Sequence, residues 1–181
     1  EDADLEIALP GTLFGVFLHS GQLCESGTRL FVPSSIYDTV IEGLKALSKT
    51  LAIGNPLDEN TGVGPVISQR QKETVLEYIE SGISEGARLV CGGKEAVVEG
   101  LENGYFIEPT IFADVTNDMK IAREEIFGPV APVIRFNTEY EAVAIANATP
   151  YGLASYFYAR DMARIWRVME SLEYGMVGVN E

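Results

Sequence analysis

Apolar residues along the chain follow two patterns, stripes at helical spacing and short continuous runs. The stripes predict amphipathic helices over residues 1–20, in two pieces broken near Pro10-Gly11, and after caps at Ser34-Ser35, Ser68-x-x-Gln71, Thr138-x-x-Glu141 and Asp161. The runs predict strands over residues 28–32, 87–91, 105–112, 130–136, 153–159 and 176–179. Because strands alternate with capped helices, the expected fold class is α/β, a twisted, mostly parallel sheet flanked by helices.

Prolines limit two of these elements. Pro10 removes a backbone donor and is expected to interrupt the first helix. Pro109 is expected to make residues 105–112 an edge strand or two short extended pieces, because proline cannot donate to the middle of a sheet. The helix after Asp161 has one apolar face, made of Met162, Ile165, Trp166, Met169 and Leu172.

Composition narrows the possible function classes. The chain has 181 residues, which suits one domain with a substantial core, and a formal net charge of −14. This charge argues against nucleic acid and anionic membranes as partners, because both require clustered Lys and Arg. The two cysteines and the lack of a signal-peptide pattern predict a cytoplasmic protein. His19 is the only histidine, so no metal site is expected, and it is predicted to line a substrate funnel or finish a helix.

A cysteine stands in the segment Gly21-Gln22-Leu23-Cys24-Glu25-Ser26-Gly27-Thr28-Arg29, between a predicted helix and a predicted strand. Gly21 can adopt positive φ and end the helix, and Gly27 allows a close backbone approach. Such a join directs Cys24 and its own amide N–H into a cleft, where a thiolate can attack and the N–H can stabilise an oxyanion. The alternative is that Cys24 is a small buried hydrophobic residue, as Cys91 is expected to be.

A second dense segment is Glu124-Glu125-Ile126-Phe127-Gly128-Pro129-Val130, with two acids beside an aromatic residue and a rigid Gly-Pro pair. It can be an ordinary turn with solvated acids. Its other interpretation is a binding wall, because a carboxylate accepts hydrogen bonds from vicinal hydroxyls and an apolar ring excludes water.

Together the two segments resemble the nucleophile and cofactor signatures of the aldehyde dehydrogenase superfamily. Further matches follow in the family's order: Gly54-Asn55-Pro56-Leu57-Asp58, Gly64-Pro65, Gly92-Gly93-Lys94, Glu108-Pro109-Thr110, Tyr151-Gly152-Leu153-Ala154 and Gly175-x-Val177-x-Val179-Asn180. The resemblance implies a fold of the catalytic-domain type, with NAD or NADP as cofactor. It implies that Cys24 is the catalytic thiol, that Glu125 binds the nicotinamide ribose and that Phe127 packs near the nicotinamide.

The same resemblance implies oxidation of an aldehyde to a carboxylic acid through a thiohemiacetal and a thioester on Cys24. The family's general-base glutamate and cofactor-binding domain are expected before the first residue, and its oligomerisation segment after the last. Residues 1–181 are therefore expected to be the catalytic domain only, inactive when isolated, from an enzyme that forms homo-oligomers. Two alternatives remain: an acylating relative that transfers the acyl group to coenzyme A, and a non-catalytic truncated paralogue.

The aldehyde is less well defined by the sequence. Segments such as Leu153 to Asp161 look closest to succinate-semialdehyde dehydrogenases. Those enzymes carry an arginine three residues before the Gly-Gln pair, where this chain has Leu18, and a bidentate arginine is hard to replace in carboxylate recognition. An aldehyde with a distal carboxylate is therefore a plausible substrate, but it is not favoured over a neutral aliphatic or aromatic aldehyde.

Overall fold

The computed structural model describes residues 2–181, so the predicted helical start at Glu1 lies outside the described residues. The helices are α1 (Leu5–Phe17), α2 (Tyr37–Ser48), α3 (Gln69–Ser84), α4 (Lys120–Arg123), α5 (Glu139–Asn147) and α6 (Met162–Ser171), with short 3-10 helices η1 (Leu18–Gly21) and η2 (Ser34–Ile36). The strands are β1 (Leu30–Pro33), β2 (Arg88–Cys91), β3 (Thr110–Val115), β4 (Val130–Phe136), β5 (Ala154–Phe157) and β6 (Met176–Val179).

Four strands form the main sheet in the order β1-β4-β3-β2, and β5 and β6 form a separate pair. The pairs β1–β4, β3–β4 and β5–β6 are parallel, and only β2 runs antiparallel to its neighbour β3 among the described pairs. The α/β prediction with a mostly parallel sheet is therefore confirmed.

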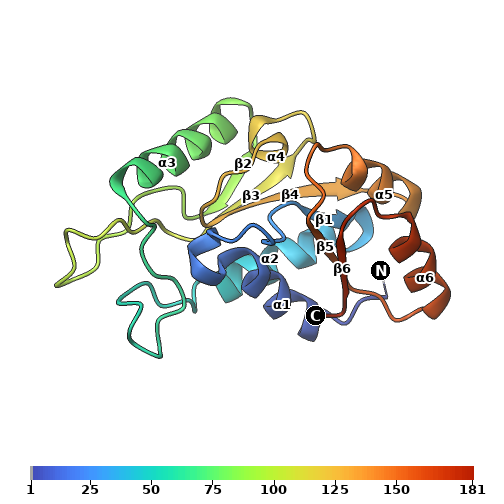
Figure 1. Ribbon diagram of the computed structural model, residues 1–181, viewed down its shortest axis with the longest axis horizontal. Coiled ribbons are helices and arrows are strands. Elements are labelled where there is room, and N and C mark those ends of the chain that lie inside the picture. Colours follow the sequence, from blue (N-terminus) through green and yellow to red (C-terminus); the bar gives the residue numbers. More distant parts are fainter. Residues whose placement is uncertain (1) are drawn as a thin grey trace.

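Helices cover both faces of the main sheet (Figure 1). Alternate residues of β3 and β4 point to opposite faces, as the period of a strand requires. Ile111 and Val133 join one apolar cluster with residues of α1 and α2, whereas Phe112 and Ile134 join another with residues of α3 and α4. Two cores thus hold the sheet rigidly between helical layers.

Most predicted helix starts are confirmed by their caps. The side chains of Ser68, Thr138 and Asp161 each accept a hydrogen bond from the backbone N–H three residues later. The predicted cap at Ser34-Ser35 is wrong, because the Ser34 hydroxyl instead donates to the Phe136 carbonyl, 3.0 Å away, and η2 intervenes before α2.

Three prolines affect the predicted elements in different ways. Helix α1 runs unbroken through Pro10, which is exposed, so the carbonyl that loses its partner one turn earlier can reach water. Residues 105–112 form two short extended pieces, as one of the two alternatives predicted: Ile107 makes an isolated bridge with Glu95, and β3 begins after Pro109. The edge-strand alternative is wrong, because β3 is internal and Pro109 removes no donor from its ladder. Pro132 lies inside β4, and the register of β3 against β4 shifts directly after the residue paired with Pro132.

The apolar face of α6 is less buried than the pattern indicates. No residue of α6 is buried; the side chains of Met162 and Trp166 are 62% and 54% exposed. Glu139 connects α6 to α5 through ion pairs with Arg164 and Arg167. No helix within residues 2–181 has the length and apolarity needed to cross a membrane.

Candidate active site

The loop that carries Cys24 begins where α1 ends at Phe17. His19, Ser20 and Gly21 then have φ values of 50°, 60° and 71°, so the chain turns through left-handed conformations before the cysteine. The prediction that Gly21 has positive φ is confirmed, although the α-helix itself ends four residues earlier. Cys24 follows in the turn and is exposed, which excludes the interpretation as a buried hydrophobic residue.

The Cys24 loop contacts the Glu124–Pro129 segment directly. A Cβ atom added to Gly21 would lie 2.1 Å from the carbonyl oxygen of Gly128 and 2.5 Å from its carbonyl carbon. Only glycine fits at this contact, because real Cβ atoms do not approach a backbone oxygen so closely. The two segments, separated by about a hundred residues in the sequence, are therefore packed backbone to backbone.

Glu125 and Phe127 both lie on the surface of their segment. The Phe127 ring is 37% exposed, and its backbone has φ of 55° although it is not glycine. Between these two residues Ile126 is buried and anchors the segment in the core around α3 and α4. The predicted acid and aromatic wall thus points outward from a fixed turn.

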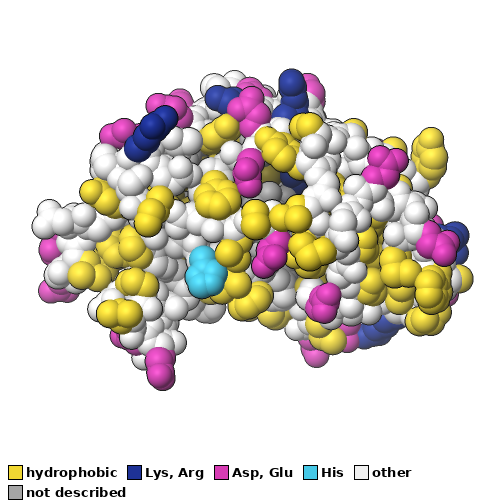
Figure 2. Space-filling model, in the orientation of Figure 1, with side chains coloured by type: hydrophobic (Ala, Val, Ile, Leu, Met, Phe, Trp, Pro, Cys, Tyr) yellow, Lys and Arg dark blue, Asp and Glu magenta, His cyan; other side chains and the backbone are white. Residues whose placement is uncertain are grey.

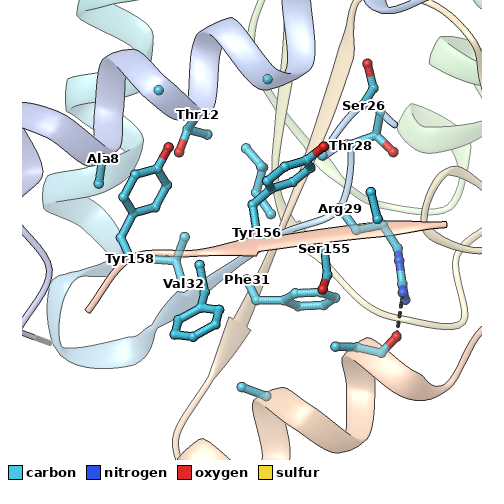
Figure 3. A pocket seen from close by; sticks show the side chains of 18 of the residues that line it. Ala8, Thr12, Ser26, Thr28, Arg29, Phe31, Val32, Ser155, Tyr156 and Tyr158 are labelled. Atoms are coloured by element: carbon cyan, nitrogen blue, oxygen red, sulfur yellow. Dashed lines mark hydrogen bonds between the residues drawn. The ribbon is translucent and has the colours of Figure 1, made fainter. Parts of the chain in front are cut away.

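Both segments line one cavity of about 1060 Å³, which includes Cys24, Glu125 and Phe127 in its wall. The cavity continues between β1 and β5, and Figure 3 shows Tyr156 of β5 near Ser26 and Thr28 on the nucleophile side. The Ser26 and Ser155 hydroxyls are buried there and have no hydrogen-bond partner within residues 2–181. Arg29 is held at the other side by α5, where it donates to the Ala146 carbonyl at 2.8 Å (Figure 3).

The acids and other polar groups near Cys24 have defined positions. Glu25 is exposed, and Arg29 bonds to Asn117, Tyr174 and α5 carbonyls rather than to Glu25, so Glu25 points to solvent. Burial raises the pKa of Tyr156, and the charges of Glu25, Glu181 and Cys24 raise it further, so this phenol stays protonated at neutral pH beside the cysteine loop.

The two other residues considered in the sequence lie away from the cavity chemistry. His19 is exposed on the face shown in Figure 2, among apolar side chains, and is not part of the cavity wall. Cys91 is half-buried, with its Sγ 3.4 Å from the Ser48 hydroxyl and 3.9 Å from the Pro109 carbonyl, consistent with a structural role. Within residues 2–181 no group of three His, Cys, Asp or Glu side chains is placed to hold a metal.

Three supporting residues were not identified from the sequence. Ser20 donates from its hydroxyl to the Gly64 carbonyl at 2.8 Å, and Gln22 accepts from the Ile67 backbone N–H at 2.9 Å. Gln71 donates to the carbonyls of Ile126 and Phe127 at 3.1 and 2.8 Å. Only Gln71 had a sequence signal, its place in a capping box, and that signal indicated a different partner.

Comparison with known proteins agrees with this geometry. A family model described as "Aldehyde dehydrogenase family" matches residues 1–181. A betaine aldehyde dehydrogenase of Brucella anthropi is 47% identical over 180 residues, and a glutarate-semialdehyde dehydrogenase of Pseudomonas putida is 46% identical; each match covers 99% of this chain. Many further proteins match as well.

Two solved structures with the same fold contain NAD+. The structure of an aldehyde dehydrogenase of Mycobacterium tuberculosis complexed with NAD+ superposes with a TM-score of 0.95 at 44% identity, over 99% of this chain and 37% of that one. A betaine aldehyde dehydrogenase of Staphylococcus aureus, in complex with NAD+ and with a BME-modified cysteine, superposes with a TM-score of 0.97 at 38% identity, over 100% of this chain and 37% of that one.

These matches define both what the chain is and how much of its relatives it represents. It spans 37% of the length of the Brucella relative and 36% of the Pseudomonas relative. Within that span the family model, the sequence identity and the superposition all agree. The chain therefore belongs to the aldehyde dehydrogenase family.

Proposed function

We propose that the full-length protein oxidises an aldehyde to a carboxylic acid with NAD or NADP, and that Cys24 is its nucleophile. The observation that carries the proposal is the direct contact between two loops at Gly21 and Gly128. Because of this contact, an exposed thiol and an outward-facing acid and aromatic pair line one cavity. The similarity to named aldehyde dehydrogenases supports the same chemistry.

The chemistry assigned to Cys24 has two covalent stages. Its thiolate adds to the aldehyde carbonyl carbon and gives the oxyanion of a thiohemiacetal, which re-forms the carbonyl with loss of a hydride and leaves a thioester. A thiol suits both stages, because it is nucleophilic when ionised and its thioester is readily cleaved. Among the described residues the backbone N–H of Cys24 has no protein acceptor, so it is free to stabilise the oxyanion at each stage.

The residues of the second segment fit a nicotinamide cofactor. When bound, NAD or NADP supplies the acceptor for the hydride. The Glu125 carboxylate is exposed and can accept hydrogen bonds from vicinal ribose hydroxyls, and the exposed Phe127 ring offers an apolar surface that excludes water beside the thioester carbon. Fixing both groups on one turn orients the cofactor with respect to Cys24.

We assign residues 1–181 the role of the catalytic domain, with cofactor binding and oligomerisation completed by other parts of the protein. The general base that activates water for deacylation belongs to those other parts. A protein that lacked this base and transferred its acyl group to coenzyme A would be an acylating relative. We further propose that the enzyme acts in the cytoplasm as a homo-oligomer.

For the aldehyde, the cavity wall near the nucleophile favours no single charge. Leu18 lines the cavity at the position where succinate-semialdehyde dehydrogenases carry an arginine that can pair with a carboxylate. The relatives named for betaine aldehyde and for glutarate semialdehyde show nearly the same identity to this chain, 47% and 46%. We therefore propose a small aliphatic or aromatic aldehyde as the substrate class, with a polar tail as a variant to be tested.

The test uses the full-length protein and follows NADH or NADPH formation with hexanal, betaine aldehyde and succinic semialdehyde, with and without coenzyme A. Cys24→Ser is expected to lower turnover by more than about 10³-fold. The matched control Cys91→Ser, which changes a half-buried thiol outside the described cavity wall, is expected to retain activity. Full turnover by the Cys24 variant would refute the proposal, and inactivity of the wild type with every aldehyde would favour the non-catalytic paralogue.

A further inference from the structure

The start of α3 forms a brace between the two loops of the candidate site. The residues from Gly64 to Gln71 contact the cysteine loop at one end and the Phe127 turn at the other. Ser20 and Gln22 are bonded to the Gly64 carbonyl and the Ile67 N–H, on the approach to α3. Gln71, in the first turn of α3, provides the contact to the other loop.

Gln71 departs from the usual role of its position. Its backbone N–H donates to the Ser68 side chain at 3.2 Å, as a capping box requires. In a complete box the glutamine side chain would reach back to the Ser68 backbone N–H. Here its amide nitrogen donates instead to two successive carbonyls, those of Ile126 and Phe127.

The turn that receives these hydrogen bonds is strained. Phe127 has φ of 55°, a conformation that costs a non-glycine residue free energy and persists only where surrounding contacts enforce it. The hydrogen bonds from Gln71 fall on the carbonyls immediately before and within this strained residue. Gly128 completes the arrangement, because a Cβ there would lie 2.4 Å from a methyl group of Val75 on α3.

We propose that Gln71 is a positioning residue that holds the Glu125–Phe127 wall at its distance from Cys24. It acts through the two backbone carbonyls and is not itself assigned contact with substrate or cofactor. This inference rests on the proposed function, because the wall must receive the cofactor for its position to affect turnover. Loss of the amide donor lets the Phe127 turn relax, whereas Cys24 stays fixed by Ser20 and Gln22.

The experiment compares Gln71→Met, which keeps the length but removes the donor, with Gln71→Glu, which places an acceptor against two carbonyls. Gln69→Met is the matched control, because Gln69 lies half a turn away, is exposed, and bonds only to Glu73 among the described residues. Each variant of the full-length enzyme is assayed for NAD+ dissociation constant, single-turnover hydride transfer and the rate at which iodoacetamide alkylates Cys24.

For Gln71→Met we expect weaker NAD+ binding and hydride transfer slowed by about 10- to 100-fold, with a larger loss for Gln71→Glu. Cys24 alkylation without cofactor should remain within about twofold of wild type in every variant, since the thiol loop keeps its own contacts. Gln69→Met should match wild type throughout. This split between cofactor and thiol readouts separates positioning from general damage to the fold.

Several results would overturn the inference. Gln71 variants that behave like Gln69→Met would show that the carbonyl contacts do not set the wall. A fall in Cys24 alkylation equal to the fall in hydride transfer, or failure of both Gln71 variants to fold, would make Gln71 a general structural residue. A wild-type enzyme without NAD(P)-dependent aldehyde oxidation would instead refute the proposed function, so the two failures are distinguishable.

Discussion

The contact between Gly21 and Gly128 gives the sharpest prediction about the site. In Gly21→Ala the new Cβ would meet the Gly128 carbonyl oxygen at 2.1 Å, in a backbone with φ of 71°. Non-bonded carbon and oxygen atoms need about 3 Å or more, so the two loops must separate by about 1 Å. The left-handed conformation of alanine adds about 1 kcal/mol or more to the cost of folding.

A displacement of this size is expected to lower turnover of the full-length enzyme by about 10²-fold, because the proposed nucleophile and the proposed cofactor-binding wall lose their relative position. The unfolding free energy of the 181-residue chain is expected to fall by about 1–3 kcal/mol. The measurements are steady-state NADH formation and urea denaturation.

Gly15→Ala is the matched control for this variant. Gly15 lies within α1, and a Cβ there meets no atom within 4 Å. Because Gly15 lines the same cavity as Cys24, this variant is a control for stability only: replacing a helical glycine by alanine without a clash should raise stability by about 0.5–1 kcal/mol. If Gly21→Ala keeps full turnover and stability, the contact does not set the site geometry and the reasoning from it fails.

Two further predictions concern the scaffold. Tyr37→Phe should lower the unfolding free energy by about 1–3 kcal/mol, measured by urea denaturation. The fully buried Tyr37 hydroxyl accepts a hydrogen bond from the Asp114 N–H and donates one to the Val133 carbonyl, and both groups would lose this partner. An unchanged urea midpoint would contradict this prediction. Arg167 and Arg164 lower the pKa of Glu139 below its usual range, so this carboxylate stabilises the folded chain above about pH 4.3 and ceases to do so as the pH falls through its lowered value. Thermal melts should therefore show Glu139→Gln less stable than wild type at neutral pH, with the gap closing on acidification; a constant gap would show that charge is not the cause.

The sequence predicted well where local patterns determine structure. The caps at Ser68, Thr138 and Asp161 depend on neighbouring residues only, and each was confirmed. It failed at Pro10, where exposure decides whether a lost hydrogen bond matters. It could not choose between an edge strand and two short pieces for residues 105–112, because position within the sheet depends on distant strands. Propensity contains no information about which side of a helix faces water or which strand becomes internal.

The candidate site divides in the same way. Cys24, Glu125 and Phe127 could be selected from the sequence because each lies in a short segment with an unusual combination of neighbouring residues. The contact that unites them, Gly21 against Gly128, joins segments from opposite halves of the chain, and no local signal indicates it. The supporting bonds of Ser20 and Gln22 join the cysteine loop to Gly64 and Ile67, 44 and 45 residues away in the sequence, and were missed for the same reason.

Left-handed backbone conformations become informative about function only when their causes are compared. Asp114 has φ of 57° where the register of β3 shifts, and the Tyr37 hydroxyl receives its N–H. Asn180 has φ of 62°, and its side chain exchanges two hydrogen bonds with Ala159, which supports a role in closing the last strand rather than shaping the site. Both conformations are explained by the fold alone.

Ser20 and Phe127 differ from Asp114 and Asn180 in the contacts that stabilise their left-handed conformations. Ser20 is followed directly by Gly21, which touches the Phe127 turn through Gly128, and both strained residues are bonded to the segment at the start of α3. Strained residues from distant segments that are bonded to one segment, at the start of α3, require a shared set of contacts, which costs stability that simple packing does not demand. That convergence, rather than positive φ itself, is the structural reason to locate chemistry beside Cys24.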